Sequence, residues 1–378
     1  TTGTQNTAVG KSAGATNTTG SSLTAVGYLA LNLNTSGSHN VAVGSGCLQQ
    51  NTTGQLNVGV GTANLNDNTT GQKLTAVGHA ALMSNTTAND NTAVGYHALN
   101  LNTTGSSNTA VGVAALDANT TGTQNVAIGL QALDSNTTAS NNTAVGFSSL
   151  LSNTTGPDNV AVGKDALKAN TTGGYNVGIG RQTLLSATTA SYNTGVGNGV
   201  LKLNTTGSFN IGMGAGALDN NITGSNNVGL GINALGNNTT ASNNTAVGTS
   251  ALIANTTGNS NVAVGPYALD ANTTASNNVS MGYASLGANT TGGQNVAVGS
   301  TSLDSNTTGS NNVSIGHTAM ESNTTGQRNI AIGSHALDAG NGSFNVAVGH
   351  NTLTSSTASN NTALGYNSLN ANTTGTHN

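Results

Sequence analysis

One pattern governs this chain: a glycine preceded by a short aliphatic segment recurs at every seventeenth position. It stands at Gly10, Gly27, Gly44 and onward to Gly333, and two further copies, Gly349 and Gly365, follow at intervals of 16. The 22 copies cover essentially all 378 residues. A period this short is typical of a repeat protein whose units stack on one another. We therefore treat 1–378 as one repetitive array, and we expect it to be an excerpt of a longer chain.

The first part of each repeat predicts a short β-strand. We number the unit from Asn91 (position 1) to Ser107 (position 17). Position 2 is Thr, Val or Ile in every copy, and position 4 is Val, Ile, Leu or Met. Residues two apart lie on the same face of a strand, and β-branched residues favour strands. We therefore expect positions 2 and 4 to point into the coil.

Position 3 lies between them and is only Ala, Gly or Ser. A face open to water would tolerate long polar side chains, so we expect a neighbouring chain to lie against it. The predicted oligomer face comprises, in the first seven copies, Ala8, Ala25, Ala42, Gly59, Ala76, Ala93 and Ala110. The simplest such assembly is a homotrimer with position 3 facing the axis.

The remaining positions divide into a fixed frame and variable corners. Position 9 is Leu in 20 copies, which predicts a second short strand with Leu turned inward. Positions 12–15 read Asn-Thr-Thr-Gly, a turn sequence. Stacking of identical turns would place Asn at positions 1 and 12 in columns whose amides hydrogen-bond along the stack. The fold class is therefore all-β, a parallel β-solenoid of about 22 coils with about 17 residues per coil.

Composition excludes several classes of protein. The chain has 7 Lys+Arg against 11 Asp+Glu, a balance unsuited to nucleic-acid binding. It contains no run of 18 apolar residues, so we expect no membrane insertion in this segment. Its low net charge and many β-branched residues argue against disorder.

Chemistry at a single site is not expected, and we predict neither an enzyme nor a cofactor or metal site. Cys47 occupies a slot usually held by Ala, which indicates a buried thiol. The seven His are spread over corner positions 6, 7 and 17, which favours solvated residues over a metal site. Asp117 and Asp134 lie on adjacent turns, where a solvated edge is favoured over weak cation binding or acid–base work.

Sugar contact, glycosylation and ice binding are conceivable at the surface of such a repeat. All ten aromatic residues lie at positions 6, 7 or 17 and are candidates for surface contact with sugar rings: Tyr28, Tyr96, Phe147, Tyr175, Tyr192, Phe209, Tyr267, Tyr283, Phe344 and Tyr366. Position 12 begins an Asn-x-Thr/Ser acceptor for glycosylation in most copies, but a column of stacked Asn is favoured. Ice binding is disfavoured because adjacent Thr103 and Thr104 would point in opposite directions.

The repeat resembles the head repeats of trimeric autotransporter adhesins, which carry a Ser-Val-Ala-Ile-Gly-like pentad. It also resembles repeats of phage and prophage tail-fibre proteins, in which Asn-Thr-Ala-Val-Gly-Tyr-x-Ala-Leu precedes Asn-Thr-Thr-Gly; Tyr96, Ala98 and Leu99 fit that pattern. The resemblance implies a left-handed β-roll that trimerises and attaches to host matrix or surfaces. The adhesin units are shorter than the unit of this chain.

The sequence thus predicts a structural repeat shaft of an extracellular or virion fibre, serving as a spacer and attachment element. Its expected partners are copies of itself and a cell-surface polysaccharide or host surface. Two alternatives stay open: a solenoid filament that polymerises end to end, and a repeat surface that binds glycans or, less favoured, ice.

Overall fold

A computed structural model describes residues 2–378 and contains 22 three-residue strands, with no helix among the described residues. The chain divides into two compact units, the first ending at Ser191 and the second beginning at Tyr192. The first unit contains β1 (Thr7–Val9), β2 (Thr24–Val26), β3 (Val41–Val43), β4 (Val58–Val60), β5 (Thr75–Val77), β6 (Thr92–Val94), β7 (Thr109–Val111), β8 (Val126–Ile128), β9 (Thr143–Val145), β10 (Val160–Val162) and β11 (Val177–Ile179). The second contains β12 (Thr194–Val196), β13 (Ile211–Met213), β14 (Val228–Leu230), β15 (Thr245–Val247), β16 (Val262–Val264), β17 (Val279–Met281), β18 (Val296–Val298), β19 (Val313–Ile315), β20 (Ile330–Ile332), β21 (Val346–Val348) and β22 (Thr362–Leu364).

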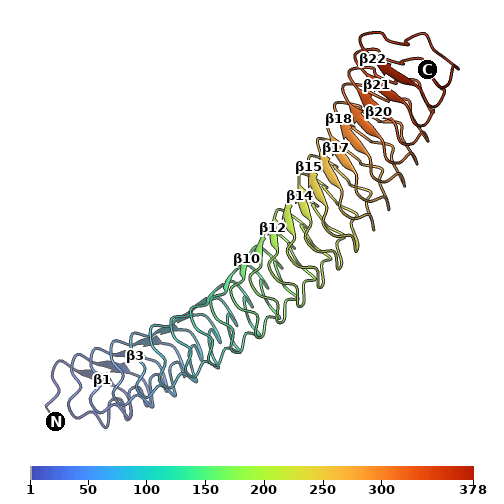
Figure 1. Cartoon of the computed structure of the whole chain (residues 1–378). Coiled ribbons are helices and arrows are strands. Elements are labelled where there is room, and N and C mark those ends of the chain that lie inside the picture. Colours follow the sequence, from blue (N-terminus) through green and yellow to red (C-terminus); the bar gives the residue numbers. More distant parts are fainter. Residues whose placement is uncertain (1) are drawn as a thin grey trace. The chain divides into compact units, whose positions relative to one another are not determined.

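Within each unit, every strand pairs in parallel with the next strand along the chain, one repeat away. Ala93 of β6 lies opposite Ala110 of β7, and Ala246 of β15 lies opposite Ala263 of β16. Figure 1 shows the strands of each unit following one another in chain order, one per coil. The predicted fold class is confirmed, because the chain is an all-parallel β-solenoid with one repeat unit per turn. A single continuous shaft over 1–378 stays a prediction.

Two columns of asparagine hold successive turns together, as the sequence predicted. At position 12, the amide Nδ2 of Asn119 donates to Oδ1 of Asn102 at 2.8 Å, and Nδ2 of Asn136 donates to Oδ1 of Asn119 at 2.8 Å. At position 1, Oδ1 of Asn91 accepts from the backbone N–H of Asn108 at 2.8 Å. These side chains are buried, so each bond satisfies polar groups that water cannot reach.

The two columns meet at the carbonyl of position 15. Gly105 O accepts Nδ2 of Asn91 at 2.8 Å and Nδ2 of Asn102 at 2.9 Å. One carbonyl therefore links position 1 of the turn to position 12 of the same turn. Because the same pattern repeats in the next turn, the ladder sets both the path within a turn and the register between turns.

The few interruptions of the ladder leave identifiable atoms without partners. Position 12 of one turn is Ala187, and Oδ1 of Asn170 in the preceding turn is buried without a hydrogen-bond partner. Oδ1 of Asn323 is also buried without a hydrogen-bond partner, because the next turn is shorter and has Gly340 in place of Asn at position 12. At position 1, the buried Leu23 and Leu74 replace Asn with an apolar side chain.

The predicted orientation of the strands is wrong, because position 3 faces the inside of the coil rather than a neighbouring chain. Of the seven residues assigned to an oligomer face, Ala25, Ala42, Gly59, Ala76, Ala93 and Ala110 are buried within one chain, and Ala8 on β1 is exposed. Positions 2 and 4 are instead half-buried or exposed.

The physical reason is the narrow interior. Position 3 lies against positions 8 and 9 of the preceding turn, which leaves room for little more than a methyl group. A Cβ placed on Gly212 would lie 2.5 Å from Cγ1 of Val200 and 3.8 Å from Cδ1 of Leu201. A Cβ on Gly59 would lie 2.5 Å from Sγ of Cys47. At these two sites glycine at position 3 thus makes room for a residue at position 8 that is larger than the usual Ala.

The predicted second strand is also wrong, although Leu at position 9 does point inward. Positions 7 and 9 have left-handed backbone angles, as at His97 (φ 56°) and Leu99 (φ 53°), which no β-strand adopts. Leu99 is fully buried. Its backbone N–H still bonds to the next turn, at Ala115 O (2.9 Å). Packing of the leucine offsets a left-handed conformation that costs about 1–2 kcal/mol.

The invariant glycine at position 5 is required by both conformation and space. Gly95 has φ +140°, and a Cβ there would overlap the backbone oxygen of Gly112 in the next turn. We predict that Gly95→Ala lowers the free energy of unfolding by about 2–4 kcal/mol, because strain and a backbone clash add. The matched control is Gly46→Ala at position 7, where φ is +67° and the nearest neighbour would lie at 3.5 Å. Urea denaturation should separate the two; equal effects would contradict this explanation of the glycine.

Completing the asparagine ladder should stabilise the chain. We predict that Ala187→Asn raises the free energy of unfolding by about 1 kcal/mol, because its amide can donate to the unpartnered Oδ1 of Asn170. The reverse change, Asn119→Ala, removes donors to Asn102 and Gly122 and should cost about 2 kcal/mol or more. Loss of stability in Ala187→Asn would mean that the ladder does not act as described.

Candidate interaction surface

The outward side chains of the strands form a surface of short, mostly aliphatic side chains in each unit. We call positions 2 and 4 of all strands the outer sheet face. Val94 is 36% exposed and Ile128 40% exposed, although both are aliphatic. Position 2 adds Thr and Val side chains that are mostly half-buried by their neighbours. The result is two parallel rows of short, branched side chains along the stack.

Charge is confined to other positions. Every Lys, Arg, Asp and Glu lies at position 6, 7, 10, 11 or 17, so none lies on the outer sheet face. Positions 17 and 6 lie in sequence on either side of the strand, so charged and aromatic residues border this face. An uncharged centre with a polar border is typical of a protein–protein interface.

The size of the outer sheet face can be estimated from strand geometry. Each unit has eleven strands. At about 4.8 Å per strand and roughly 10 Å across two side-chain rows, one unit presents on the order of 500 Å². Contiguous apolar patches of this size on soluble chains are commonly functional.

All ten predicted surface aromatics are exposed, and the solenoid brings several of them together. At positions 6 and 7, Tyr96 stacks on His97 with ring centroids 4.1 Å apart, and His79 of the preceding turn lies 5.4 Å from Tyr96. At position 17, Tyr192 stacks on Phe209 at 5.0 Å. Because these rings stack on one another, the ring faces on which a sugar would stack are already occupied.

Cations cover other aromatic rings. Nζ of Lys164 lies 5.5 Å from the Phe147 ring centroid, and the guanidinium of Arg328 lies 5.4 Å from that of Phe344. Such contacts stabilise exposed sites by about 0.5–1 kcal/mol. Together with the ring stacks, they explain the aromatic corners in part as contacts between turns.

Several copies carry an acidic, half-buried side chain at position 10, and we call these residues the acidic column. Burial raises the pKa of six of these carboxyls above the ordinary 3.8: Asp117, Asp134, Asp219, Asp270, Asp304 and Asp338. The charge of Asp117 raises the pKa of Asp134 further. The predicted solvated edge is therefore only partly solvated, because these carboxylates lie partly within the wall of the coil.

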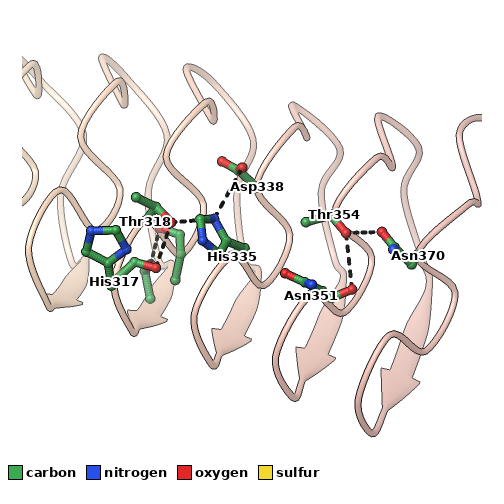
Figure 2. A network of polar contacts seen from close by, with 9 residues as sticks. His317, Thr318, His335, Asp338, Asn351, Thr354 and Asn370 are labelled. Atoms are coloured by element: carbon green, nitrogen blue, oxygen red, sulfur yellow. Dashed lines mark hydrogen bonds and ion pairs between the residues drawn. The ribbon is translucent and has the colours of Figure 1, made fainter.

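The last turns contain a network of polar contacts (Figure 2). The Thr318 hydroxyl lies 2.7 Å from the backbone oxygen of His317 and 2.7 Å from Nδ1 of His335. Nδ1 of His335 lies 3.9 Å from Oδ2 of Asp338. One turn on, the Thr354 hydroxyl contacts the Asn351 backbone oxygen at 3.1 Å and the side chain of Asn370.

The other chemical candidates fall within the frame of the repeat. Cys47 is fully buried, and this burial raises the pKa of its thiol to about 12, which disfavours the reactive thiolate. Asn at position 12, such as Asn102, is buried and its amide donates hydrogen bonds, so the Asn-x-Thr/Ser glycosylation pattern is not accessible in the folded chain. Within residues 2–378, no group of three or more His, Cys, Asp and Glu is arranged to hold a metal ion, and no helix is long and apolar enough to cross a bilayer.

The outer sheet face was missed from the sequence because strand periodicity does not say which face is inside. One signal could have identified it: the smallest side chains are at position 3, and small side chains fit where two walls of a coil approach each other, so position 3 belongs inside. The absence of charge at positions 2 and 4 does not contradict this assignment, because an outward face can lack charge if another surface covers it.

The chain matches no known protein-family model and no curated protein at a significant level.

The acidic column gives a prediction with a defined sign. A carboxyl whose pKa is higher in the folded than in the unfolded chain binds its proton more tightly when folded. Its contribution to stability therefore falls as pH rises from about 3.8 through the raised value, and the ionised group is unfavourable at neutral pH.

We predict that Asp117→Asn combined with Asp134→Asn raises the melting temperature at neutral pH and weakens its dependence on pH in the acid range. Asparagine already occupies position 10 at Asn100. The control is Asp90→Asn at position 17, whose side chain is 52% exposed and lies 3.8 Å from Nζ of Lys73. Thermal melts of the double variant that match or fall below the wild type would contradict the prediction.

Proposed function

We propose that this chain is the repeat shaft of an extracellular fibre, of a cell surface or a virion, and that copies of it associate through the outer sheet face. The observation that carries the proposal is the uncharged, partly exposed double row of aliphatic and Thr side chains along each unit. Water contact with such a surface is unfavourable by about 25 cal/mol per Å². Covering it with a second copy removes that cost along the whole stack.

The size of the face supports association of copies. Two opposed faces would bury roughly 1,000 Å² in total per unit, which is near the lower limit for a specific interface. A partner with the same repeat would match the face turn by turn, since its rows have the same spacing. A partner with a different period would lose register after a few turns.

Three copies around a common axis are the arrangement we favour. Each face then meets two neighbours at the axis, while the charged and aromatic positions lie outside. The resemblance to trimeric adhesin heads and tail-fibre repeats supports this number, and it is the only support for left-handed coiling. It also supports a role as spacer and attachment element toward a host surface or polysaccharide. In this arrangement the side chains at positions 2 and 4 face the common axis, instead of those at position 3 that the sequence analysis placed there.

A repetitive structural role agrees with the near-identity of the buried positions from turn to turn. Each turn presents the same backbone and the same buried asparagines, so a substitution in one turn is matched by equivalents in many others. Catalysis would need one turn to differ from the rest in several coordinated residues. The glycan-binding alternative receives less support, because several exposed rings stack on one another.

Association can be tested by placing charge on the outer sheet face in three consecutive turns. We predict that wild-type chain has a discrete mass near three chain masses by analytical ultracentrifugation. The triple variant Val94→Lys, Val111→Lys and Ile128→Lys should dissociate at least tenfold more readily, because it buries like charges together. Circular dichroism should show that its β structure is kept.

The matched control is Leu33→Lys combined with Leu101→Lys, at exposed position 11 outside the outer sheet face. This variant should assemble like wild type. A monomeric wild type would contradict the proposal, and so would a triple variant that assembles normally. A mass that grows without limit would favour end-to-end filaments instead.

A further inference from the structure

The interruption of the asparagine ladder at Ala187 leaves a polar atom inside the first unit without a partner. Asn170, Ala187 and Ala190 are all fully buried. Oδ1 of Asn170 accepts no hydrogen bond, whereas the equivalent Oδ1 of Asn102 accepts from Nδ2 of Asn119 at 2.8 Å. A buried acceptor of this kind is unfavourable unless a donor reaches it.

The carbonyl of Ala190, at position 15 of the interrupted turn, receives only part of its usual hydrogen bonding. In a complete turn this oxygen accepts from two side-chain amides, as Gly105 O does from Asn91 and Asn102. Ala190 O accepts from Nδ2 of Asn176, the amide of position 1, at 2.8 Å. Position 12 of this turn has no amide to supply the second bond, although a carbonyl oxygen can accept two.

The two acceptors face the same small region. Ala190 O and Oδ1 of Asn170 both lie within 2.5 Å of the point where a Cβ on Gly173 would stand. They are therefore at most about 5 Å apart, a gap that one molecule with two hydrogen bonds of about 2.8 Å can bridge. At the matching point over Gly105, Nδ2 of Asn119 lies 2.9 Å away. That amide nitrogen is the group that Ala187 lacks.

The backbone around Ala187 keeps the frame of the repeat. Its N–H bonds to Leu184 O at 3.2 Å, and the Thr171 N–H of the preceding turn bonds to Thr188 O at 2.9 Å. Complete turns have the same two bonds. Alanine in place of asparagine therefore removes the atoms Cγ, Oδ1 and Nδ2 while the wall around them stays in place. Three heavy atoms leave a space comparable with the roughly 30 Å³ that a water molecule takes in the liquid.

We propose that one water molecule binds at this place and replaces the missing amide. Its two O–H groups donate to Oδ1 of Asn170 and to Ala190 O, which are the two bonds that Nδ2 of position 12 makes in a complete turn. Water suits the site because both facing groups are acceptors, and buried waters typically satisfy polar groups that lack a protein partner. The inference does not rest on the proposed fibre function, because the site lies inside the coil.

The second interruption of the ladder does not carry the same inference. Oδ1 of Asn323 is also without a partner, but the next turn has 16 residues instead of 17. There the side-chain oxygen of Asn341 accepts the Thr324 N–H at 2.6 Å, a bond that a backbone oxygen accepts in complete turns. The frame is altered, so the place of the missing amide is not kept.

The water can be counted by relaxation dispersion of water ¹⁷O in solutions of the full chain, which detects long-lived internal waters. Ala187→Asn should lower the count by one, because its amide takes the place of the water. Asn119→Ala should raise the count by one, because it leaves Oδ1 of Asn102 and Gly122 O around the same kind of space. The control is Asp90→Asn at exposed position 17, which should leave the count unchanged.

The stabilisation expected of Ala187→Asn keeps its sign, because the amide makes the same two bonds without immobilising a water. Circular dichroism on each variant separates a lost water from a lost fold.

A high-resolution crystal structure of the wild-type chain locates the water independently of any variant. We expect a density peak about 2.7–3.0 Å from both Oδ1 of Asn170 and Ala190 O. The proposal is overturned if no peak lies there, if the peak contacts only one of the two oxygens, or if a folded Ala187→Asn chain keeps the wild-type count.

Discussion

The structure depends on one recurring interaction, the pair of asparagine amides that meet at the carbonyl of position 15. In the turn that contains Gly105, this single oxygen accepts from Asn91 and Asn102. Each asparagine also bonds to the neighbouring turn, Asn91 through its Oδ1 and Asn102 through its Nδ2. A slip of the chain by one residue would break all these bonds at once inside a dry interior. Thin coils with few large apolar side chains are therefore fixed in register by polar groups rather than by a large hydrophobic core.

The interior follows from this frame. Because the two walls are held close together, position 3 accepts only small side chains, and the leucines at position 9 are among the largest fully buried side chains. Changes of size are offset locally, as where Gly212 faces Val200 and Gly59 faces Cys47. Interior packing and the ladder explain why variation is confined to the corners.

Periodicity predicted the fold class, the strand at positions 2–4, the parallel stacking and the asparagine columns, because each of these depends on a repeat of residue types along the chain. It did not predict which strand face is inside. Alternation at Thr92, Ala93 and Val94 is the same whichever face is buried, and only the close approach of Leu to the strand decides it. Nor did it predict the left-handed backbone at His97 and Leu99, because these residue types rarely adopt it. The contacts of His335 also escaped prediction, since they depend on the orientation of its ring toward Thr318 and Asp338.

Outward Val and Ile side chains with no charged residue among them are the feature that the proposed function must explain, and association of copies explains it. Cryo-electron microscopy of the purified chain tests this most directly, because it shows both the number of chains in cross-section and the direction of each strand face. We expect rods of three chains with positions 2 and 4 turned toward a common axis and position 3 inside each coil. Particles with a single chain in cross-section and the outer sheet face in contact with solvent would contradict the account.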